Sequence, residues 1–172
     1  MQLLERLSCY VKTQQMKITR TVSGELVEVV IGEVTATDFA RIRRNKAFIF
    51  DWELEQAYEL YKLHLKDDES QILGLLSVKD YPEELRIHIN LIEVIKSQVG
   101  KAKTLDNIAG CLIAYACALA FKRGYEGFVS LQPKTRLIGL YQDKYGFRQY
   151  GRLLAVEYES SKQLIDKYIG DE

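Results

Sequence analysis

The sequence has little that would divide it into separate parts. It contains only two prolines among 172 residues, which leaves little room for an interdomain linker. We find no internal repeat and no low-complexity segment. A chain of this length is long enough to bury one sizeable core, so we predict a single domain over residues 1–172.

The sequence also lacks an excess of either charge and any long apolar run. Twenty-four basic residues balance twenty-four acidic ones, giving a net charge of zero. That balance disfavours a nucleic-acid partner bound by bulk electrostatics, although a local basic patch remains open. No run is apolar enough to cross a membrane, and the start has no signal-peptide pattern. We therefore expect no membrane partner.

Cysteine is scarce and shows no metal-ligand spacing. The three cysteines are Cys9, Cys111 and Cys117. Cys111 and Cys117 lie six residues apart in a helical pattern, on different faces, which disfavours a disulfide between them. A sparse, odd count is typical of a reducing compartment, so we predict a cytoplasmic protein whose helical cysteines are core residues and which holds no metal.

The first third of the chain alternates between helical and strand patterns. Leucines near the start predict a short helix within residues 1–16. Residues 17–34 are rich in β-branched side chains and predict a strand or a hairpin, interrupted at 23–25. Thr35 and Asp38 then favour a capped helix start. Three aromatic residues follow, and core packing is favoured over an acceptor pocket for them: Phe48, Phe50 and Trp52.

Three strands joined by short polar turns come next and predict an antiparallel meander. They span residues 58–66, 71–79 and 85–95. The alternation of the third strand slips beyond Leu91, where Glu93 falls on the face that had been apolar. Two interpretations stay open: a β-bulge with one inserted residue, or a Glu93 that simply emerges into water at the strand end.

The most apolar stretch of the sequence predicts a buried helix over residues 107–123. Gly124 supplies its stop signal, and Asp106 or Thr104 is expected to cap its start. A short buried strand at 127–131 follows, which predicts a parallel βαβ crossover. The remaining elements are expected as follows: a helix from Pro133 to Gly146, a strand over 147–158 with a kink or turn at Gly151, and a last helix opened by Ser160 or Ser161.

The segment that leads into the buried helix has the makings of a phosphate site. A strand ends near Ile95, and a loop with small and basic residues follows it. A helix N-terminus then offers unpaired N–H groups and a partial positive charge, which together suit an anion. The candidate phosphate-binding residues are Gln98, Gly100, Lys101, Lys103, Asn107, Ile108, Ala109 and Gly110.

This organisation resembles the GNAT acetyltransferase superfamily over residues 58–150. Leu140–Phe147 is similar to the family pattern of an apolar residue, Tyr, three residues and Gly-Phe, and the order of elements matches as well. Gly100–Lys101, Lys134–Thr135 and Leu137–Ile138 look like those of small bacterial members. The resemblance implies an α/β (α+β) fold with a mixed, mostly antiparallel sheet, a parallel βαβ crossover, splayed strands and helices on both faces.

The phosphate loop departs from the family pattern Gln/Arg-x-x-Gly-x-Gly/Ala. Residues 98–102 have the right types but lie before the helix and are one residue short. Residues 104–109 have the right place, with Thr104 for Gln/Arg and Asn107 for the first Gly. Asn tolerates a positive φ better than other non-glycine residues, so the second register is sterically allowed.

The resemblance implies acetyl-CoA as donor and a small-molecule or peptide amine as acceptor. The N–H groups of residues 108–110, with Lys101 or Lys103, would bind the pyrophosphate. Residues 93–95 would pair with the pantetheine arm, and an N–H near Val94 or Ile95 would stabilise the oxyanion. Lys134 is a further cofactor candidate, at a position where many relatives have Asn.

Two residues are candidates for the chemistry. Glu93 is the expected base for the acceptor amine, and Tyr141 lies at the family's position for the donor of a proton to the departing thiolate. His64 and His88, on polar strand faces, are weaker candidates for acceptor contact. The alternatives are a non-catalytic GNAT-fold module that binds CoA or other proteins, and an RNA-directed acetyltransferase or toxin. A homodimer is left open.

Overall fold

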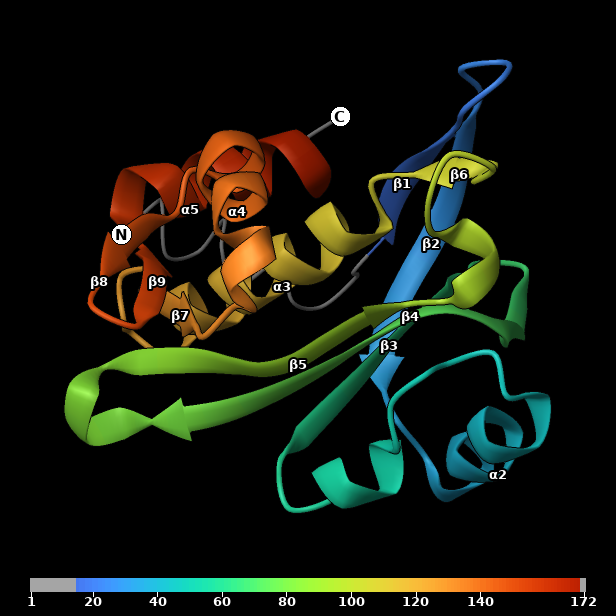
Figure 1. Ribbon diagram of the computed structural model, residues 1–172, viewed down its shortest axis with the longest axis horizontal. Helices are drawn as coiled ribbons and strands as arrows, with labels where there is room; N and C mark the ends of the chain where they lie inside the picture. Colours follow the sequence, from blue (N-terminus) through green and yellow to red (C-terminus); the bar gives the residue numbers. More distant parts are fainter. Residues whose placement is uncertain (1–14, 171–172) are drawn as a thin grey trace.

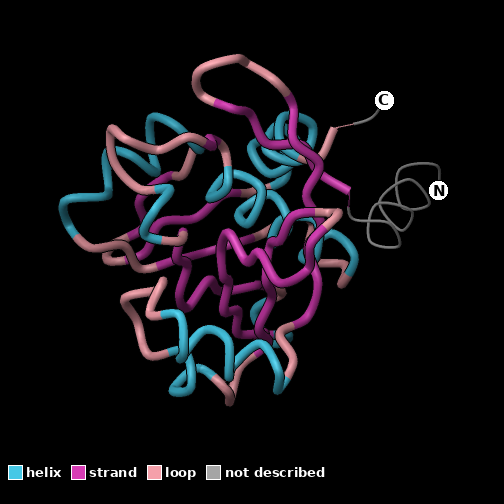
Figure 2. The backbone as a smooth tube through the Cα atoms, turned by 90° about the vertical axis from the view of Figure 1, so that its right-hand side faces the viewer, coloured by secondary structure: helices cyan, strands magenta, loops and turns pink. Residues whose placement is uncertain are grey.

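One sheet forms the centre of the protein. A computed structural model describes residues 15–170 and arranges nine strands in the order β6-β1-β2-β3-β4-β5-β7-β9-β8. Only β5 and β7 are paired in parallel, and the other pairs are antiparallel. Helices cover both faces: α3, α4 and α5 lie on one, and α2 lies on the other (Figure 1). Figure 2 shows the strands between these two helical layers. The predicted fold class is confirmed.

The N-terminal part forms a hairpin on one side of the sheet. β1 (Gln15–Arg20) pairs with β2 (Leu26–Glu33), as one of the two sequence interpretations predicted. The helix predicted within residues 1–16 lies almost wholly outside the described residues. A two-residue strand, β6 (Leu105–Asp106), pairs with β1 and was not predicted, because two residues are too few to show a period.

The predicted meander is confirmed and contains the bulge. β3 (Glu59–Leu65), β4 (Asp68–Tyr81) and β5 (Arg86–Val94) run antiparallel. Ser77 pairs with Leu91 but Val78 pairs with Ile89, which leaves Asn90 as the inserted residue of a β-bulge. The other interpretation, an exposed Glu93, is wrong because the Glu93 side chain is 7% exposed.

The buried helix α3 (Ile108–Lys122) is the core of the larger layer. Every residue from Gly110 to Phe121 is buried between the sheet and α5 (Tyr158–Tyr168). Two glycines allow this close packing. A Cβ on Gly74 of β4 would lie 2.9 Å from Leu112, and one on Gly110 would lie 2.3 Å from the ring of Tyr168. Burial raises the pKa of Cys111 and Cys117 to about 12, so both thiols are inert core groups, as predicted.

The C-terminal elements follow the expected order with shifted boundaries. β7 (Val129–Leu131) leads through the 3₁₀ helix η4 (Thr135–Leu137) into α4 (Ile138–Tyr145). The strand predicted over 147–158 is a hairpin of two strands turning at Gly151, β8 (Arg148–Tyr150) and β9 (Leu153–Val156). The last helix begins at Tyr158 rather than at a serine cap.

A smaller core lies on the other face of the sheet. α2 (Ala36–Asn45) begins at the predicted cap, where Thr35 and Asp38 form a reciprocal capping box. Helix α2 and the 3₁₀ helix η1 (Trp52–Glu55) pack on β4 and the end of β5. Phe48 and Trp52 are buried there, which confirms core packing for both, whereas Phe50 is 40% exposed.

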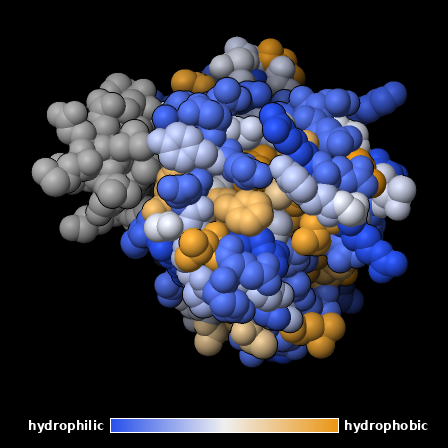
Figure 3. Space-filling model, turned by 90° about the vertical axis from the view of Figure 1, so that its left-hand side faces the viewer, coloured by the Kyte–Doolittle hydropathy of each residue, from blue (hydrophilic) through white to orange (hydrophobic). Residues whose placement is uncertain are grey.

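The outer surface is polar over the side that carries the C-terminal hairpin. On the face shown in Figure 3, apolar side chains lie in small groups between hydrophilic ones, as on a solvated surface. Among residues 15–170, no helix combines the length and apolar character needed to cross a membrane.

A buried ion pair ties α2 to the sheet. The Lys62 ammonium of β3 donates to Asp38 at 2.8 Å and to Glu69 at 2.7 Å, and the Lys62 and Asp38 side chains are 2% and 1% exposed. Burial alone would raise the pKa of Asp38, but hydrogen bonds from Lys62 and Thr35 outweigh it and lower that pKa. The pair is therefore charged at neutral pH.

Removing the ammonium of Lys62 should destabilise the fold strongly. Lys62→Met removes the ammonium from the buried Asp38 carboxylate and leaves only Arg41, at a longer 3.6 Å, as a charged partner. We expect a loss of about 3–5 kcal/mol in the free energy of unfolding, measured by urea denaturation. The matched control is Lys66→Met, which breaks an exposed pair with Glu28 and should cost less than about 1 kcal/mol. Equal effects of the two changes would contradict this account.

The same pair predicts an acid dependence of stability. The folded-state pKa of Asp38 is lowered, so its contribution is complete above the ordinary carboxyl value of about 3.9 and is lost as the pH falls through the folded value. Urea midpoints measured from pH 6 down to pH 3 should fall less steeply in Lys62→Met than in the unmodified protein.

Candidate active site

The candidate site lies where β5 and β7 separate, and the unpaired edge of β5 forms one of its walls. The two strands pair only at residues 87–89 with 129–131, and β5 continues to Val94 with no partner on that side in the described chain (Figure 1). The Ile95 N–H donates to Leu73 O of β4 at 2.9 Å. Since the N–H direction alternates along a strand, the N–H groups of Ile92 and Val94 turn toward the gap. Of the two donors predicted for an oxyanion, Val94 therefore has the free N–H.

The start of α3 is held open without a side-chain cap. Asn107 adopts φ 75°, the left-handed conformation that the second register required. Neither predicted cap serves the helix: Asp106 instead accepts from the Asn107 N–H and from Lys103. The first backbone bond of the helix runs from Cys111 N to Asn107 O, so the N–H groups of residues 108–110 have no partner within the helix.

Access to these N–H groups is uneven. Asn107 and Ala109 are half-buried, whereas Ile108 and Gly110 are buried. The ring of Tyr168 covers Gly110, and the Tyr168 hydroxyl is buried with no hydrogen-bond partner among the described residues. A buried hydroxyl without a partner is costly, so this end of the helix fits a polar ligand or a water.

The loop before α3 joins the two registers that the sequence left apart. The Gln98 side-chain oxygen accepts from the N–H groups of Thr104 and Leu105 at 2.9 and 2.8 Å. Gln98 therefore closes the loop onto the residues that precede the helix. Gly100 has φ 86° at the exposed tip beside the exposed Lys101, a conformation that favours glycine.

Tyr141 lies in an aromatic cluster on the α3 face. Its ring centroid is 5.9 Å from that of Tyr145 and 5.6 Å from that of Phe147. Tyr145 in turn lies 6.3 Å from Tyr168, the ring over Gly110. A row of aromatic side chains thus connects Tyr141 with the start of α3. Burial raises the pKa of Tyr141, so its phenol is protonated at neutral pH. Unlike the Tyr168 hydroxyl, the Tyr141 hydroxyl is not both fully buried and without a hydrogen-bond partner.

Glu93 faces the other side of the sheet. Its carboxylate accepts hydrogen bonds from the Ile49 N–H, from the Phe50 N–H at 3.3 Å and from the Trp52 indole at 2.8 Å. Both oxygens are therefore engaged in fixing the segment between α2 and η1. Its expected role as a base stays a prediction, and the geometry favours a structural role.

A polar group at the closed end of the gap was only partly anticipated. His88 of β5 and Ser130 of β7 are paired in the register, with Nδ1 and Oγ 2.9 Å apart. Arg86 donates to Ser130 at 2.6 Å and contacts His88 Nδ1 at 3.3 Å. Arginine cannot accept, so Nδ1 is an acceptor. Burial and then the charge of Arg86 lower the pKa of His88, which keeps it neutral.

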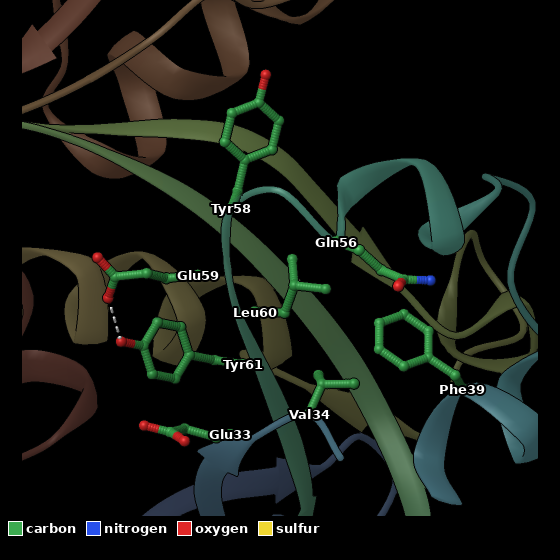
Figure 4. Close-up of a pocket in the computed structure, with 8 residues that line it drawn as sticks. All are labelled: Glu33, Val34, Phe39, Gln56, Tyr58, Glu59, Leu60 and Tyr61. Carbon is green, nitrogen blue, oxygen red and sulfur yellow. Dashed lines mark hydrogen bonds between the residues drawn. The ribbon is translucent and has the colours of Figure 1, made fainter. Parts of the chain in front are cut away.

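A hollow and His64 lie away from this gap, whereas Lys134 lies on its β7 side. The hollow in Figure 4 is lined by Glu33, Tyr58 and Tyr61 among others, over β2 and β3. It is separated from β5 by β4, so it is not part of the candidate site. Lys134 follows β7, and its ammonium lies 5.4 Å from the ring centroid of Phe50. His64 is buried and contacts its neighbour's carbonyl, which indicates a structural role.

Comparisons with known proteins identify the fold. The sequence matches no protein-family model and no curated protein. Among solved structures, it is similar to a Lactobacillus plantarum protein provisionally named an N-acetyltransferase (TM-score 0.52, 13% identity, 74% of this chain and 94% of that chain). It is also similar to the KacTA–DNA complex (0.53, 12%, 81% and 99%) and to AtaTR bound with acetyl-CoA (0.50, 14%, 80% and 98%). The chain has the GNAT fold.

The left-handed Asn107 can be tested without any ligand. Asn107→Val places a β-branched residue at φ 75° and should lower the free energy of unfolding by about 1–2 kcal/mol. Asn107→Gly, which restores the family residue, should change it by less than about 0.5 kcal/mol, because glycine accepts this φ. Urea denaturation measures both, and a neutral valine variant would contradict the conformation.

Proposed function

We propose that this protein is an acetyl-CoA-dependent N-acetyltransferase. The observation that carries the proposal is the free edge of β5, whose end lies close to Ile108 at the uncapped start of α3. An unpaired strand edge can form hydrogen bonds with the amides in the pantetheine arm of acetyl-CoA. An open helix start can bind the pyrophosphate of the same molecule. The same fold in AtaTR has been solved with acetyl-CoA bound, which agrees with this assignment of the donor.

The cofactor would be held by the two ends of the phosphate loop. Asn107 and Ala109 form the accessible part of the α3 start. The N–H groups of Ile108 and Gly110 belong to the same helical turn. The buried, unpaired hydroxyl of Tyr168 is a further donor at this turn. Lys101 supplies an exposed positive charge, while Lys103 is paired with Asp106. Gln98 and Gly100 shape the loop, and Lys134 is a proposed contact from the segment that follows β7.

Acyl transfer requires three functions from the protein. Tyr141 holds a proton at its hydroxyl and gives it to the departing sulfur. The Val94 N–H, turned into the gap, stabilises the oxyanion that forms on the carbonyl. Glu93 precedes Val94 in β5. Its carboxylate accepts three hydrogen bonds and so fixes residues 49–52 on the proposed acceptor side of the gap. The acceptor is a primary amine.

One observation favours a second candidate, a GNAT-fold module without turnover. The Tyr168 ring covers Gly110, and the Gln98 side chain is engaged in its own loop. The first feature reduces access to the Gly110 N–H, and the second leaves the Gln98 oxygen bonded within the loop. Calorimetry separates the candidates: micromolar binding of acetyl-CoA supports the enzyme, and no heat of binding at millimolar acetyl-CoA favours the module.

Tyr141 should be required for turnover but not for cofactor binding. Tyr141→Phe removes the proton donor and should lower kcat by about 100-fold, while the acetyl-CoA Kd changes less than twofold. The assay follows free CoA thiol released with an amine acceptor. Tyr150→Phe is the matched control, since Tyr150 lies in the exposed strand β8 and its hydroxyl donates to Glu157. Undiminished turnover in Tyr141→Phe would remove Tyr141 from the mechanism.

A further inference from the structure

A second carboxylate is held over β4 and the bulge of β5, and nothing in the sequence pattern singled it out. Glu55 is the last residue of η1 (Trp52–Glu55). Its Oε2 accepts from the Ser77 hydroxyl of β4 at 2.7 Å and from the Asn90 side-chain amide of β5 at 2.6 Å. Two short hydrogen bonds from neighbouring strands therefore fix this carboxylate on the sheet face opposite α3.

The partner from β5 is the bulge residue itself. Asn90 is the residue inserted opposite Ser77 and Val78, and it directly follows Ile89, the last residue that pairs with β7. Glu55 is thus attached to the first residue of β5 beyond the point where the strands separate. An inserted residue re-aims its side chain away from the regular alternation, and here Asn90 reaches the carboxylate.

The two carboxylates on this face differ in what they leave free. Glu93 is 7% exposed and uses both oxygens in hydrogen bonds. Glu55 is half-buried, and within residues 15–170 its Oε1 has no hydrogen-bond partner and its charge has no ion pair. A held carboxylate with one open oxygen and no counter-charge is suited to bind a cation from solution.

The position along the gap matches the place where acyl transfer would occur. A donor bound at the start of α3 would run along the free edge from Val94 past Ile92 toward Asn90. Four residues of strand span about 13 Å, and beyond Ile89 the pairing with β7 closes the gap. The acyl end of an extended donor therefore stops beside Asn90, next to Glu55.

We propose that Glu55 binds the protonated amine of the acceptor and accepts its proton. This inference rests on the proposed acetyltransferase function and adds one catalytic residue to it. Ser77 and Asn90 are positioning residues that aim the carboxylate. Glu93, in this arrangement, supports the wall formed by residues 49–52 and does not take the proton.

The proton balance is complete with the residues present. Glu55 takes one proton from the ammonium, and the neutral nitrogen forms a bond to the thioester carbonyl carbon. Tyr141 gives its hydroxyl proton to the sulfur as the C–S bond breaks, and it recovers a proton from the new amide nitrogen. Glu55 then releases its proton to water, so each turnover yields one amide, one thiol and one proton.

The test compares two glutamates of the same short helix. Glu55→Gln keeps the shape and removes the charge at the gap, and Glu53→Gln makes the same change at a residue paired with Arg43 on the surface. Acetyl-CoA-loaded protein is given spermidine, lysine methyl ester and a tripeptide with a free N-terminus. We expect Glu55→Gln to lower kcat/KM by about 100-fold for the amine that the unmodified protein acetylates, with Glu53→Gln within twofold.

Further measurements separate the inference from the proposed function. Calorimetry should give an acetyl-CoA Kd for Glu55→Gln within twofold of the unmodified protein. Asn90→Ala, which frees the carboxylate without removing it, should raise KM for the amine more than it lowers kcat.

Each contrary outcome has a defined meaning. Normal turnover by Glu55→Gln overturns the role of Glu55 and leaves the acetyltransferase intact. Acetyl-CoA binding without acetylation of any of the three amines overturns the binding of a cationic amine at Glu55. Failure of the unmodified protein to bind acetyl-CoA overturns the proposed function itself.

Discussion

The short parallel contact between β5 and β7 is the constraint on which the rest of the structure depends. Three residues of each strand pair, and α3 connects them as the crossover. Because α3 is apolar on nearly every side, it must pack against other elements on all of them, and the sheet and α5 provide these contacts. Where β5 and β7 separate, the sheet gives up backbone hydrogen bonds that a longer pairing would have made. Those unpaired groups are the ones that the proposed donor would use, so the lost pairing accounts for the proposed binding edge.

Local patterns in the sequence carried much of this arrangement. The alternation in β3–β5, the slip beyond Leu91 and the apolar stretch of α3 each report a property of neighbouring residues, and each was confirmed. Asn107 was interpretable for the same reason, because its left-handed backbone is a property of one residue type at one position. The position of Tyr141 came from a family motif rather than from its surroundings, and its proposed role remains to be tested.

Features that depend on contacts between distant segments were out of reach of the sequence. β6 is strand only because it meets β1, some 85 residues earlier in the chain. Glu55 sits in a short acidic turn with no period, and its partners lie 22 and 35 residues further on. Glu93 drew notice because it broke a pattern, but the pattern could not reveal that residues 49–52 donate to both of its oxygens. A pattern break marks an unusual residue without saying which partner makes it so.

The two faces of the sheet are held together by different physics, and this difference bears on how the site works. The α3 face is packed with apolar side chains and inert thiols, which stabilise one rigid arrangement beside the free edge of β5. The other face combines its smaller apolar core with polar ties, which are the buried Lys62–Asp38 pair, the bonds of Glu93 and the bonds of Glu55. Directional ties of this kind fix individual charges in place, whereas apolar packing fixes shape. In the proposed acetyltransferase, the donor would therefore meet a face set by apolar shape, and the acceptor would meet a face with fixed charges. Under that proposal, changes to the polar ties would alter acceptor choice without disturbing the large core, which agrees with one fold serving many acceptors.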